Sequence, residues 1–195
     1  MDSRLRELLA GIPKKSIIDA NRVPSAVLVP LYIKQGQYHI VFIKRTQIVT
    51  THKGQISFPG GSRETDDKTL QDTAIREAFE EIGLSPESVE VLGELDDELT
   101  LTSHFIVTPF VASIPWPYQF VKNKYEVDEI IEVPVAALLN TESRQLDFKL
   151  PEGEPFDPCA YYYRGERIWG ATARILNKLL DIFTKAGLVE EVENG

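Results

Sequence analysis

Hydrophobic and polar positions along the chain predict a mixture of strands and helices. Runs with strand-like composition cover 26–33, 38–45, 56–58, 89–95, 105–114 and 127–133. Gln35-Gly36-Gln37 predicts a hairpin turn between the first two strands, and Gly165-Glu166 predicts another between 161–164 and 167–169. Because strands and helices do not alternate regularly, a mixed sheet with helices on its faces fits better than a doubly wound parallel sheet.

Four segments carry apolar residues at helical spacing. The strongest covers 70–82, where Ile75, Phe79 and Ile82 form an apolar stripe and Gly83 is placed to end the helix. Further helices are expected over 3–12, 135–139 and 172–186. The length of 195 residues fits one α/β domain spanning 1–195, with its core at about 25–180.

Composition and charge narrow the class of protein. The net charge of −9, from 30 acidic against 21 basic residues, argues against a nucleic-acid-binding protein. No apolar run reaches the roughly 18 residues of a membrane span, and the first residues lack the pattern of a signal peptide. The single cysteine, Cys159, excludes an internal disulfide and suits a reducing compartment. We therefore expect a cytoplasmic protein that binds neither nucleic acid nor membrane.

An acidic cluster on the 70–82 helix suggests metal chemistry. Glu77, Glu80 and Glu81 have i, i+3 and i+4 spacing, which predicts one shared face opposite the apolar stripe. Like charges at that spacing destabilise a helix by a few tenths of a kcal/mol per pair. Carboxylate oxygens are ligands that suit Mg²⁺ or Mn²⁺ and leave coordination positions for substrate phosphates. The alternative is a solvated acidic face without a ligand.

Neighbouring residues favour the metal site. Gly60-Gly61 predicts a turn where the backbone can approach a ligand closely. Arg76 is placed to pair with the glutamates and fix their orientation, although an ordinary surface ion pair would use the same residues. A metal site of this kind would handle phosphate esters or anhydrides.

The stretch from Gly61 to Leu84 resembles the signature of the Nudix hydrolase superfamily. That signature is Gly, five residues, Glu, seven residues, then Arg-Glu-aliphatic-any-Glu-Glu-any-Gly-aliphatic. Residues 76–84 match the second half, but Asp67 occupies the first glutamate position and eight residues separate it from Arg76. The resemblance implies a Nudix fold, which is an α/β/α sandwich around a mixed β-sheet, and divalent-metal-dependent cleavage of a diphosphate.

The longer spacing is similar to that of the coenzyme A pyrophosphatase branch. Its upstream pattern is Arg, a small residue, three residues, Arg, three residues, Gly, three residues and Phe-Pro-Gly-Gly. Arg45, Gly54 and 58–61 match, Thr46 is a mild change, and Thr50 replaces the second arginine. Segments 107–110, 126–134 and 169–173 also resemble this branch. The branch implies cleavage of coenzyme A or acyl-coenzyme A to adenosine 3',5'-bisphosphate and 4'-phosphopantetheine.

The resemblance also implies roles for individual residues. Metal binding would fall to Glu77, Glu80 and Glu81. Arg76 would organise the glutamates, while Glu80, Glu126 or Glu129 would orient or deprotonate the attacking water. The substrate would be held by Arg45, Lys53, Gly60 and Gly61.

Several residues have competing interpretations. Glu126 and Glu129 can equally be surface residues of a strand. The Asp96-Asp97-Glu98 segment favours a solvated turn over a site wall. His52 precedes the signature and is a candidate substrate contact.

Two other functions remain open. One is hydrolysis of ADP-ribose, a dinucleotide or a nucleoside triphosphate by the same machinery. The other is a Nudix-fold regulator that binds a nucleotide without turnover. In each case the expected partner is a small nucleotide-derived molecule, and a homodimer stays open.

Overall fold

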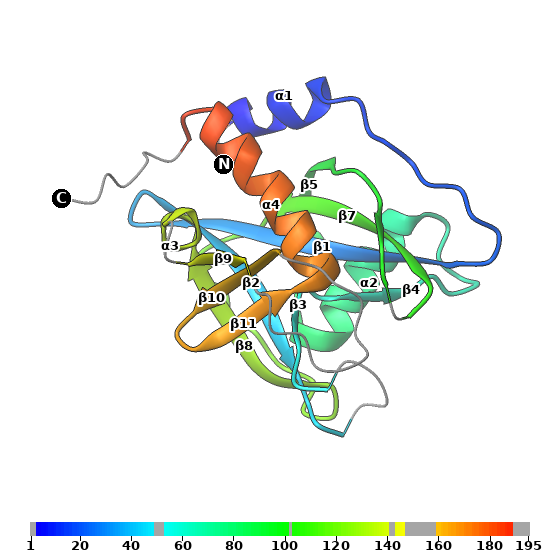
Figure 1. The fold of residues 1–195 in the computed structure, drawn as a ribbon. Helices are drawn as coiled ribbons and strands as arrows, with labels where there is room; N and C mark the ends of the chain where they lie inside the picture. The colour runs from blue at the N-terminus through cyan, green and yellow to red at the C-terminus, as the bar shows by residue number, and fades with distance from the viewer. Residues whose placement is uncertain (1–2, 49–52, 102, 141–142, 147–158, 189–195) are drawn as a thin grey trace.

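The computed structural model describes residues 3–48, 53–101, 103–140, 143–146 and 159–188 (Figure 1). The helices are α1 (Ser3–Gly11), α2 (Leu70–Ile82), the short 3₁₀ helix η1 (Pro86–Ser88), α3 (Val135–Leu139) and α4 (Gly170–Lys185). The strands are β1 (Val23–Lys34), β2 (Gln37–Arg45), β3 (Ile56–Ser57), β4 (Gly60–Ser62), β5 (Glu90–Glu94), β6 (Glu98–Leu99), β7 (Phe105–Ser113), β8 (Val127–Pro134), β9 (Arg144–Leu146), β10 (Cys159–Tyr163) and β11 (Glu166–Trp169).

The main sheet is mixed, as the pattern predicts. Its strands follow the order β3-β2-β1-β7-β5, with β4 paired to β1, β6 to β7 and β8 to β2. The long central pairing of β1 with β7 is parallel, whereas the other pairings in this sheet are antiparallel. A second sheet of β9, β10 and β11 lies beside it.

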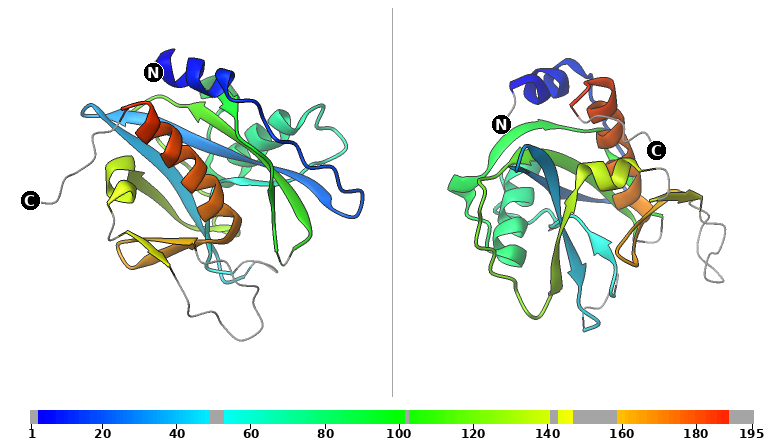
Figure 2. Two further views of the ribbon diagram at one scale, coloured as in Figure 1. Left: turned by 45° about the horizontal axis from the view of Figure 1, so that its top comes forward. Right: turned by 90° about the vertical axis from the view of Figure 1, so that its left-hand side faces the viewer.

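Helices cover both faces of the main sheet (Figure 2). Successive side chains of a strand point to opposite faces, so Val29 and Leu31 of β1 join the cluster that includes α4, while Leu28 and Tyr32 join the cluster that includes α2. The α4 side also receives Leu5 and Leu9 of α1. This arrangement confirms the predicted α/β/α sandwich.

Both predicted hairpins are present. Gln35 and Gly36 have φ angles of 52° and 78°, and Arg164 and Gly165 have φ angles of 50° and 82°. Two consecutive positive φ angles are the geometry of the tight turn that best matches the twist of paired strands. The following residues, Gln37 and Glu166, already belong to β2 and β11.

The prediction for the faces of α2 is wrong in part. Phe79, expected in the apolar stripe, is 53% exposed, whereas Glu81, expected on the polar face, is 1% exposed. The buried face instead carries Ala74, Ala78 and Ile82. These residues lie at i, i+4 and i+8, and Glu81 falls on the same side of the helix. The small side chains of Ala74 and Ala78 let α2 approach the sheet closely, and Glu81 lies on this buried side.

Short strands and one charged segment escape the sequence pattern. Strands β4, β6 and β9 have three residues or fewer, which is too short for a periodic signal. The expected solvated turn at 96–98 is also wrong, because Asp97 and Glu98 are each only 9% exposed. Asp97 accepts a hydrogen bond from Thr108 Oγ1 at 2.7 Å, and Glu98 pairs with Lys178 at 2.8 Å. Among the described helices, none has the length and apolar character needed to cross a bilayer.

Candidate active site

Capping at both ends sets the position of the glutamate helix α2. Thr69 caps the start: its Oγ1 accepts a hydrogen bond from Asp72 N at 3.1 Å, while the Asp72 carboxylate accepts one from Thr69 N at 2.8 Å. Gly83 ends the helix with a φ of 66°, a conformation that glycine adopts without steric cost. These caps define which turn of the helix carries Glu77, Glu80 and Glu81.

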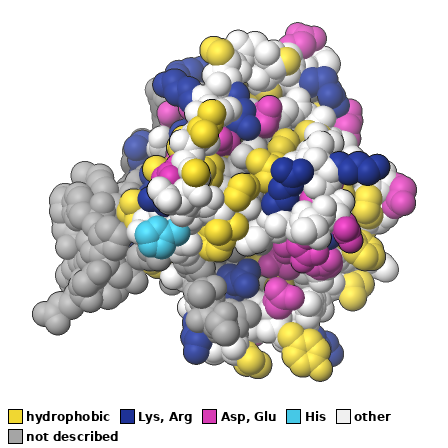
Figure 3. All heavy atoms as spheres, turned by 90° about the vertical axis from the view of Figure 1, so that its right-hand side faces the viewer, with side chains coloured by type: hydrophobic (Ala, Val, Ile, Leu, Met, Phe, Trp, Pro, Cys, Tyr) yellow, Lys and Arg dark blue, Asp and Glu magenta, His cyan; other side chains and the backbone are white. Residues whose placement is uncertain are grey.

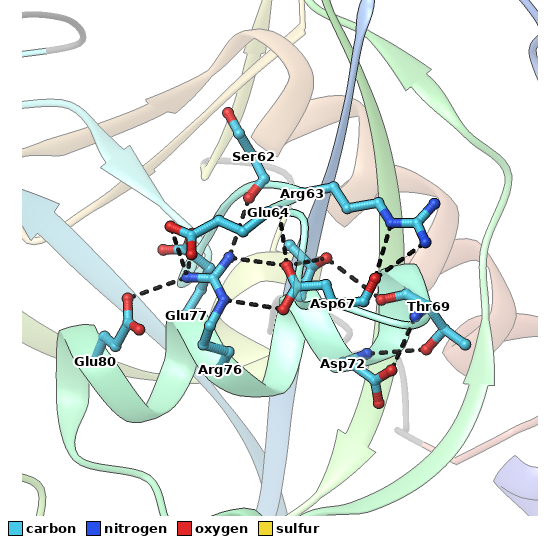
Figure 4. Close-up of polar contacts among 10 residues, drawn as sticks. Ser62, Arg63, Glu64, Asp67, Thr69, Asp72, Arg76, Glu77 and Glu80 are labelled. Atoms are coloured by element: carbon cyan, nitrogen blue, oxygen red, sulfur yellow. Dashed lines mark hydrogen bonds and ion pairs between the residues drawn. The ribbon is translucent and has the colours of Figure 1, made fainter.

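Asp67 anchors the loop in front of the helix to Arg76. Its carboxylate accepts hydrogen bonds from Arg76 Nε and Nη2, each at 3.1 Å, and from Thr73 Oγ1 at 2.9 Å (Figure 4). It also accepts one from Glu64 N at 2.9 Å. The Arg76 guanidinium is the main reason that the pKa of Asp67 falls to about 2. Asp67 therefore reaches Arg76 despite its shorter side chain and the longer spacing.

Arg76 connects this loop to two of the glutamates. Its Nη1 lies 3.0 Å from Glu77 Oε1 and 3.1 Å from Glu80 Oε2, while its Nη2 donates to Ser62 O at 3.1 Å (Figure 4). The Glu80 side chain is 50% exposed, whereas that of Glu77 is 15% exposed. The predicted organising role of Arg76 thus has a geometric basis, with Glu80 at the solvent side of the group.

Glu81 is the buried member of the cluster. Its carboxylate accepts a hydrogen bond from Gly60 N at 2.9 Å and one from Arg45 Nη1 at 3.1 Å. Burial is the main cause that raises the pKa of Glu81 to about 8, with the charge of Glu77 acting in the same direction. Because ionising a buried carboxylate is costly, a cation bound at Glu81 would stabilise its charged form.

The two glycines of β4 bring the backbone next to these carboxylates. A Cβ atom at Gly61 would collide with the Glu77 carboxylate, and one at Gly60 would collide with Ala26 O. Because glycine has no side chain, β4 fits between β1 and α2. The predicted turn at Gly60-Gly61 is instead the start of β4, and the close approach of its backbone to a ligand stays a prediction.

The sequence offered two candidate carboxylates beyond the signature, Glu126 and Glu129. Of these, Glu126 lies near Glu77 and Glu81. Its charge contributes to the raised pKa values of Glu77 and Glu81, for which burial is the main cause. Asn123 holds this segment in place, because its N donates to Glu81 O at 2.9 Å and its Nδ2 donates to Glu126 Oε1 at 3.1 Å. Glu129 is exposed on β8, opposite Lys44 of β2.

The carboxylates of Glu77, Glu81 and Glu126 are chemically suited to bind a divalent cation. Besides burial, the charge of Glu126 raises the pKa of Glu77, and the charges of Glu77 and Glu126 raise the pKa of Glu81. Hard carboxylate oxygens are the ligands that Mg²⁺ and Mn²⁺ prefer. Within the described residues, no three acidic, histidine or cysteine side chains form a ready-made metal cage. Arg76 and Arg45 occupy several of the carboxylate oxygens instead.

A pocket of about 280 Å³ opens beside the glycines and contains Arg45, Gly60 and Gly61 in its wall. Its wall also includes residues at the end of β11 and the start of α4, 169–172, together with Thr100, Leu101, Ser103 and Phe105. The sequence flagged 169–173 only as a family-like segment and did not identify the other four residues. On the face shown in Figure 3, acidic side chains gather next to basic ones and to an apolar strip.

The remaining predicted contacts lie elsewhere or outside the described residues. Lys53 is exposed in a turn and is absent from the described lining of the pocket. Thr50 and His52 fall among the residues that the structure does not describe. Cys159 belongs to β10, but its side chain is likewise outside the description.

The signature implied a mixed sheet between helices, and the structure has this architecture. The family model of the NUDIX domain matches residues 22–152. The chain therefore belongs to the Nudix family, and both the predicted fold and the predicted enzyme class, a Nudix hydrolase, are confirmed.

Relatives of known sequence support this assignment over most of the chain. Similarity to the Nudix hydrolase NudL of Photorhabdus laumondii is 34% identity over 167 residues, covering 86% of this chain and 88% of the relative. Nudix hydrolase 3 of Caenorhabditis elegans is 32% identical over 180 residues, covering 84% of this chain and 74% of the relative.

Solved structures share the fold at low sequence identity. The Nudix hydrolase RenU of M. smegmatis aligns with a TM-score of 0.54 and 18% identity, covering 87% of this chain and 90% of RenU. A MutT/nudix family protein of Enterococcus faecalis aligns with a TM-score of 0.57 and 13% identity, covering 88% of this chain and 64% of that protein.

Proposed function

We propose that this Nudix hydrolase cleaves the diphosphate of coenzyme A or an acyl-coenzyme A in a reaction that needs Mg²⁺ or Mn²⁺. The products would be adenosine 3',5'-bisphosphate and the matching 4'-phosphopantetheine. The observation that carries the proposal is the position of Glu81, which is buried and accepts hydrogen bonds from Gly60 N and Arg45, two residues that line the pocket.

Each part of the site has a role in this proposal. Glu77, Glu80 and Glu81 would hold the metal, which when bound polarises a phosphoryl oxygen and lowers the pKa of a coordinated water. Arg76 keeps Glu77 and Glu80 together. Glu126 is close enough for its charge to raise the pKa values of Glu77 and Glu81. We therefore choose Glu126, over Glu129 and Glu80, as the residue that orients the attacking water and accepts its proton.

Arg45 and the glycine strand would hold the substrate. Gly60 N and Arg45 Nη1 both donate hydrogen bonds to the Glu81 carboxylate. A cation at Glu81 would compete for those oxygens and leave the two donors available to phosphate. Lys53 is exposed at a nearby turn and would contribute only long-range attraction to the anionic substrate. We further propose that the enzyme acts in the cytoplasm on this small molecule, as a single domain.

A substrate panel tests the proposal. Wild type, Glu81→Gln and the matched control Glu7→Gln, which alters an exposed residue of α1, are assayed with coenzyme A, ADP-ribose, a dinucleotide and a nucleoside triphosphate. We expect metal-dependent release of adenosine 3',5'-bisphosphate from coenzyme A, lost by about 100-fold or more in Glu81→Gln because a metal ligand is removed.

Other outcomes would redirect the assignment. Faster hydrolysis of ADP-ribose, a dinucleotide or a triphosphate than of coenzyme A would move the enzyme to another branch of the family. Tight nucleotide binding without metal-dependent turnover would favour a regulatory module. Undiminished hydrolysis in Glu81→Gln would remove Glu81 from the proposed metal set.

A further inference from the structure

The pocket beside β4 is continuous with the carboxylate group. Gly60 and Gly61 line it, yet Gly60 N donates to Glu81 and Gly61 lies against Glu77. Arg45 joins the two regions, because it pairs with Glu81 and also lines the pocket. A substrate whose diphosphate lay beside the glutamates would therefore extend one of its ends into this pocket.

The walls indicate the chemical character of that end. Arg45 is the one ionisable side chain among the described residues of the lining. Half of the other described lining residues are aliphatic or aromatic, among them Val27, Ile56, Phe58, Phe105, Val107 and Ile175, and most of the rest are serine or threonine. Since burying a charge without a partner is costly, a neutral group fits the pocket beyond Arg45.

Two of the three aromatic residues of the wall have ring partners. Phe58 stacks on Phe42 with ring centroids 4.7 Å apart, and the guanidinium of Arg167 lies 5.1 Å from the centroid of Trp169. The rest of the lining combines aliphatic residues with serine and threonine residues, which suits a chain that carries both apolar and amide groups.

Two buried polar atoms of the lining residues are candidates for hydrogen bonds with a ligand. Arg45 Nε and Ser103 Oγ are both inaccessible to solvent and have no hydrogen-bond partner within the described part of the chain. Buried polar groups are nearly always paired in native proteins. After a side-chain rotation that exposes them to the pocket, Arg45 Nε would suit a phosphate oxygen near the carboxylates, and Ser103 Oγ would suit an amide or hydroxyl of a neutral chain.

We infer that this pocket is the binding site for the neutral, amide-bearing arm of the substrate, which in coenzyme A is the pantetheine portion. The inference rests on the proposed function and adds which end of the molecule is held there. Pockets for whole drug-sized ligands have volumes of about 300–1,000 Å³. A pocket of about 280 Å³ is therefore suited to one arm, with the adenosine end outside it.

Binding of the two product halves to the full chain tests the inference. Isothermal titration with Mg²⁺ present measures the Kd values of 4'-phosphopantetheine and adenosine 3',5'-bisphosphate for wild type and Ser103→Leu. The larger side chain would occupy the pocket, so we expect about tenfold or greater weakening for 4'-phosphopantetheine and less than about twofold for the bisphosphate. Ser16→Leu, at an exposed position away from the lining, is the matched control.

A milder variant covers the case in which Ser103→Leu does not fold. Ser103→Ala removes only the hydroxyl, and we expect its affinity for 4'-phosphopantetheine to fall by about threefold or more, with the bisphosphate unaffected. Preferential loss of bisphosphate binding would instead place the adenosine end in the pocket. Equal changes for both ligands, or no binding of 4'-phosphopantetheine to wild type, would also overturn the inference.

Turnover separates this inference from the proposed function. If wild type binds 4'-phosphopantetheine through Ser103 but does not hydrolyse coenzyme A, the pocket assignment stands and the proposed reaction fails. If coenzyme A is hydrolysed and the variants weaken both product halves equally, the proposed reaction stands and the pocket assignment fails.

Discussion

The Arg76 guanidinium lies against Asp67 with two of its nitrogens, Nε and Nη2, each 3.1 Å from a carboxylate oxygen. This contact ties the loop after β4 to the middle of α2. It also leaves Arg76 Nη1 directed at Glu77 and Glu80. The relationship links the stability of the loop to the arrangement of the site, and the first prediction follows from it.

Asp67→Ala is expected to destabilise the protein by about 2–4 kcal/mol, because Glu64 N, Thr73 Oγ1 and two nitrogens of Arg76 would lose the acceptor that they share. Urea denaturation measures the change, and activity should fall with it as Arg76 loses its anchor. Asp66→Ala is the matched control, since Asp66 is exposed. Similar midpoints for the two variants would contradict the anchoring role.

The buried Glu81 predicts how stability depends on pH without metal. The pKa of Glu81 is about 8 in the folded chain, against 4.5 as its ordinary value. The folded state therefore binds a proton more tightly than the unfolded state, so stability should decline as pH rises from about 5 to 8. Glu81→Gln cannot ionise and should lack this part of the decline.

Denaturation at several pH values in chelator measures both proteins. We expect Glu81→Gln to be more stable than wild type at pH 8 by at least about 1 kcal/mol. Adding Mg²⁺ should stabilise wild type and have little effect on the variant. A difference between the two proteins that does not change with pH would refute the burial of an ionisable Glu81.

The glycines of β4 are expected to be intolerant of a methyl group. Gly60→Ala and Gly61→Ala should each lose about 1–3 kcal/mol of stability and most activity, because the added Cβ has no room. Gly11→Ala is the control, because a Cβ there meets no atom within 4 Å. Thermal melts and turnover measure the set, and wild-type behaviour of Gly61→Ala would exclude close packing against Glu77.

Glu126 and Glu129 should differ in their effect on turnover. Glu126→Gln is expected to lower kcat by about 100-fold or more, as for loss of a general base, whereas Glu129→Gln should change it by less than about threefold. The two substitutions are chemically identical, so each serves as the control for the other. Steady-state kinetics at saturating metal measures them, and a larger loss for Glu129→Gln would reverse the assignment.

The exposed position of Phe79 has a measurable consequence for stability. Phe79→Ala should cost less than about 1 kcal/mol, while Ile82→Ala should cost about 2–5 kcal/mol because Ile82 is fully buried. Urea denaturation compares the two. If Phe79→Ala lost more stability than Ile82→Ala, Phe79 would be buried, as the apolar periodicity of the helix predicted.

Local patterns in the sequence predicted much of this protein. Periodicity located α2 and α4, and the glycines at the turns predicted both hairpins because few other residues tolerate those φ angles. The register of Arg76, Glu77, Glu80 and Glu81 identified the family, since that arrangement depends only on spacing along one helix.

Only the tertiary structure decided how those residues divide their roles. Burial depends on which side of α2 meets the sheet, so Glu81 lies inside and Phe79 outside although their sequence pattern suggested the reverse. The pairing of Asp67 with Arg76 and the meeting of Arg45 with Ser103 in one pocket join segments that no local periodicity connects. The sequence by itself thus determined the elements and the family, whereas long-range packing determined which side chains become buried, paired or available to a substrate.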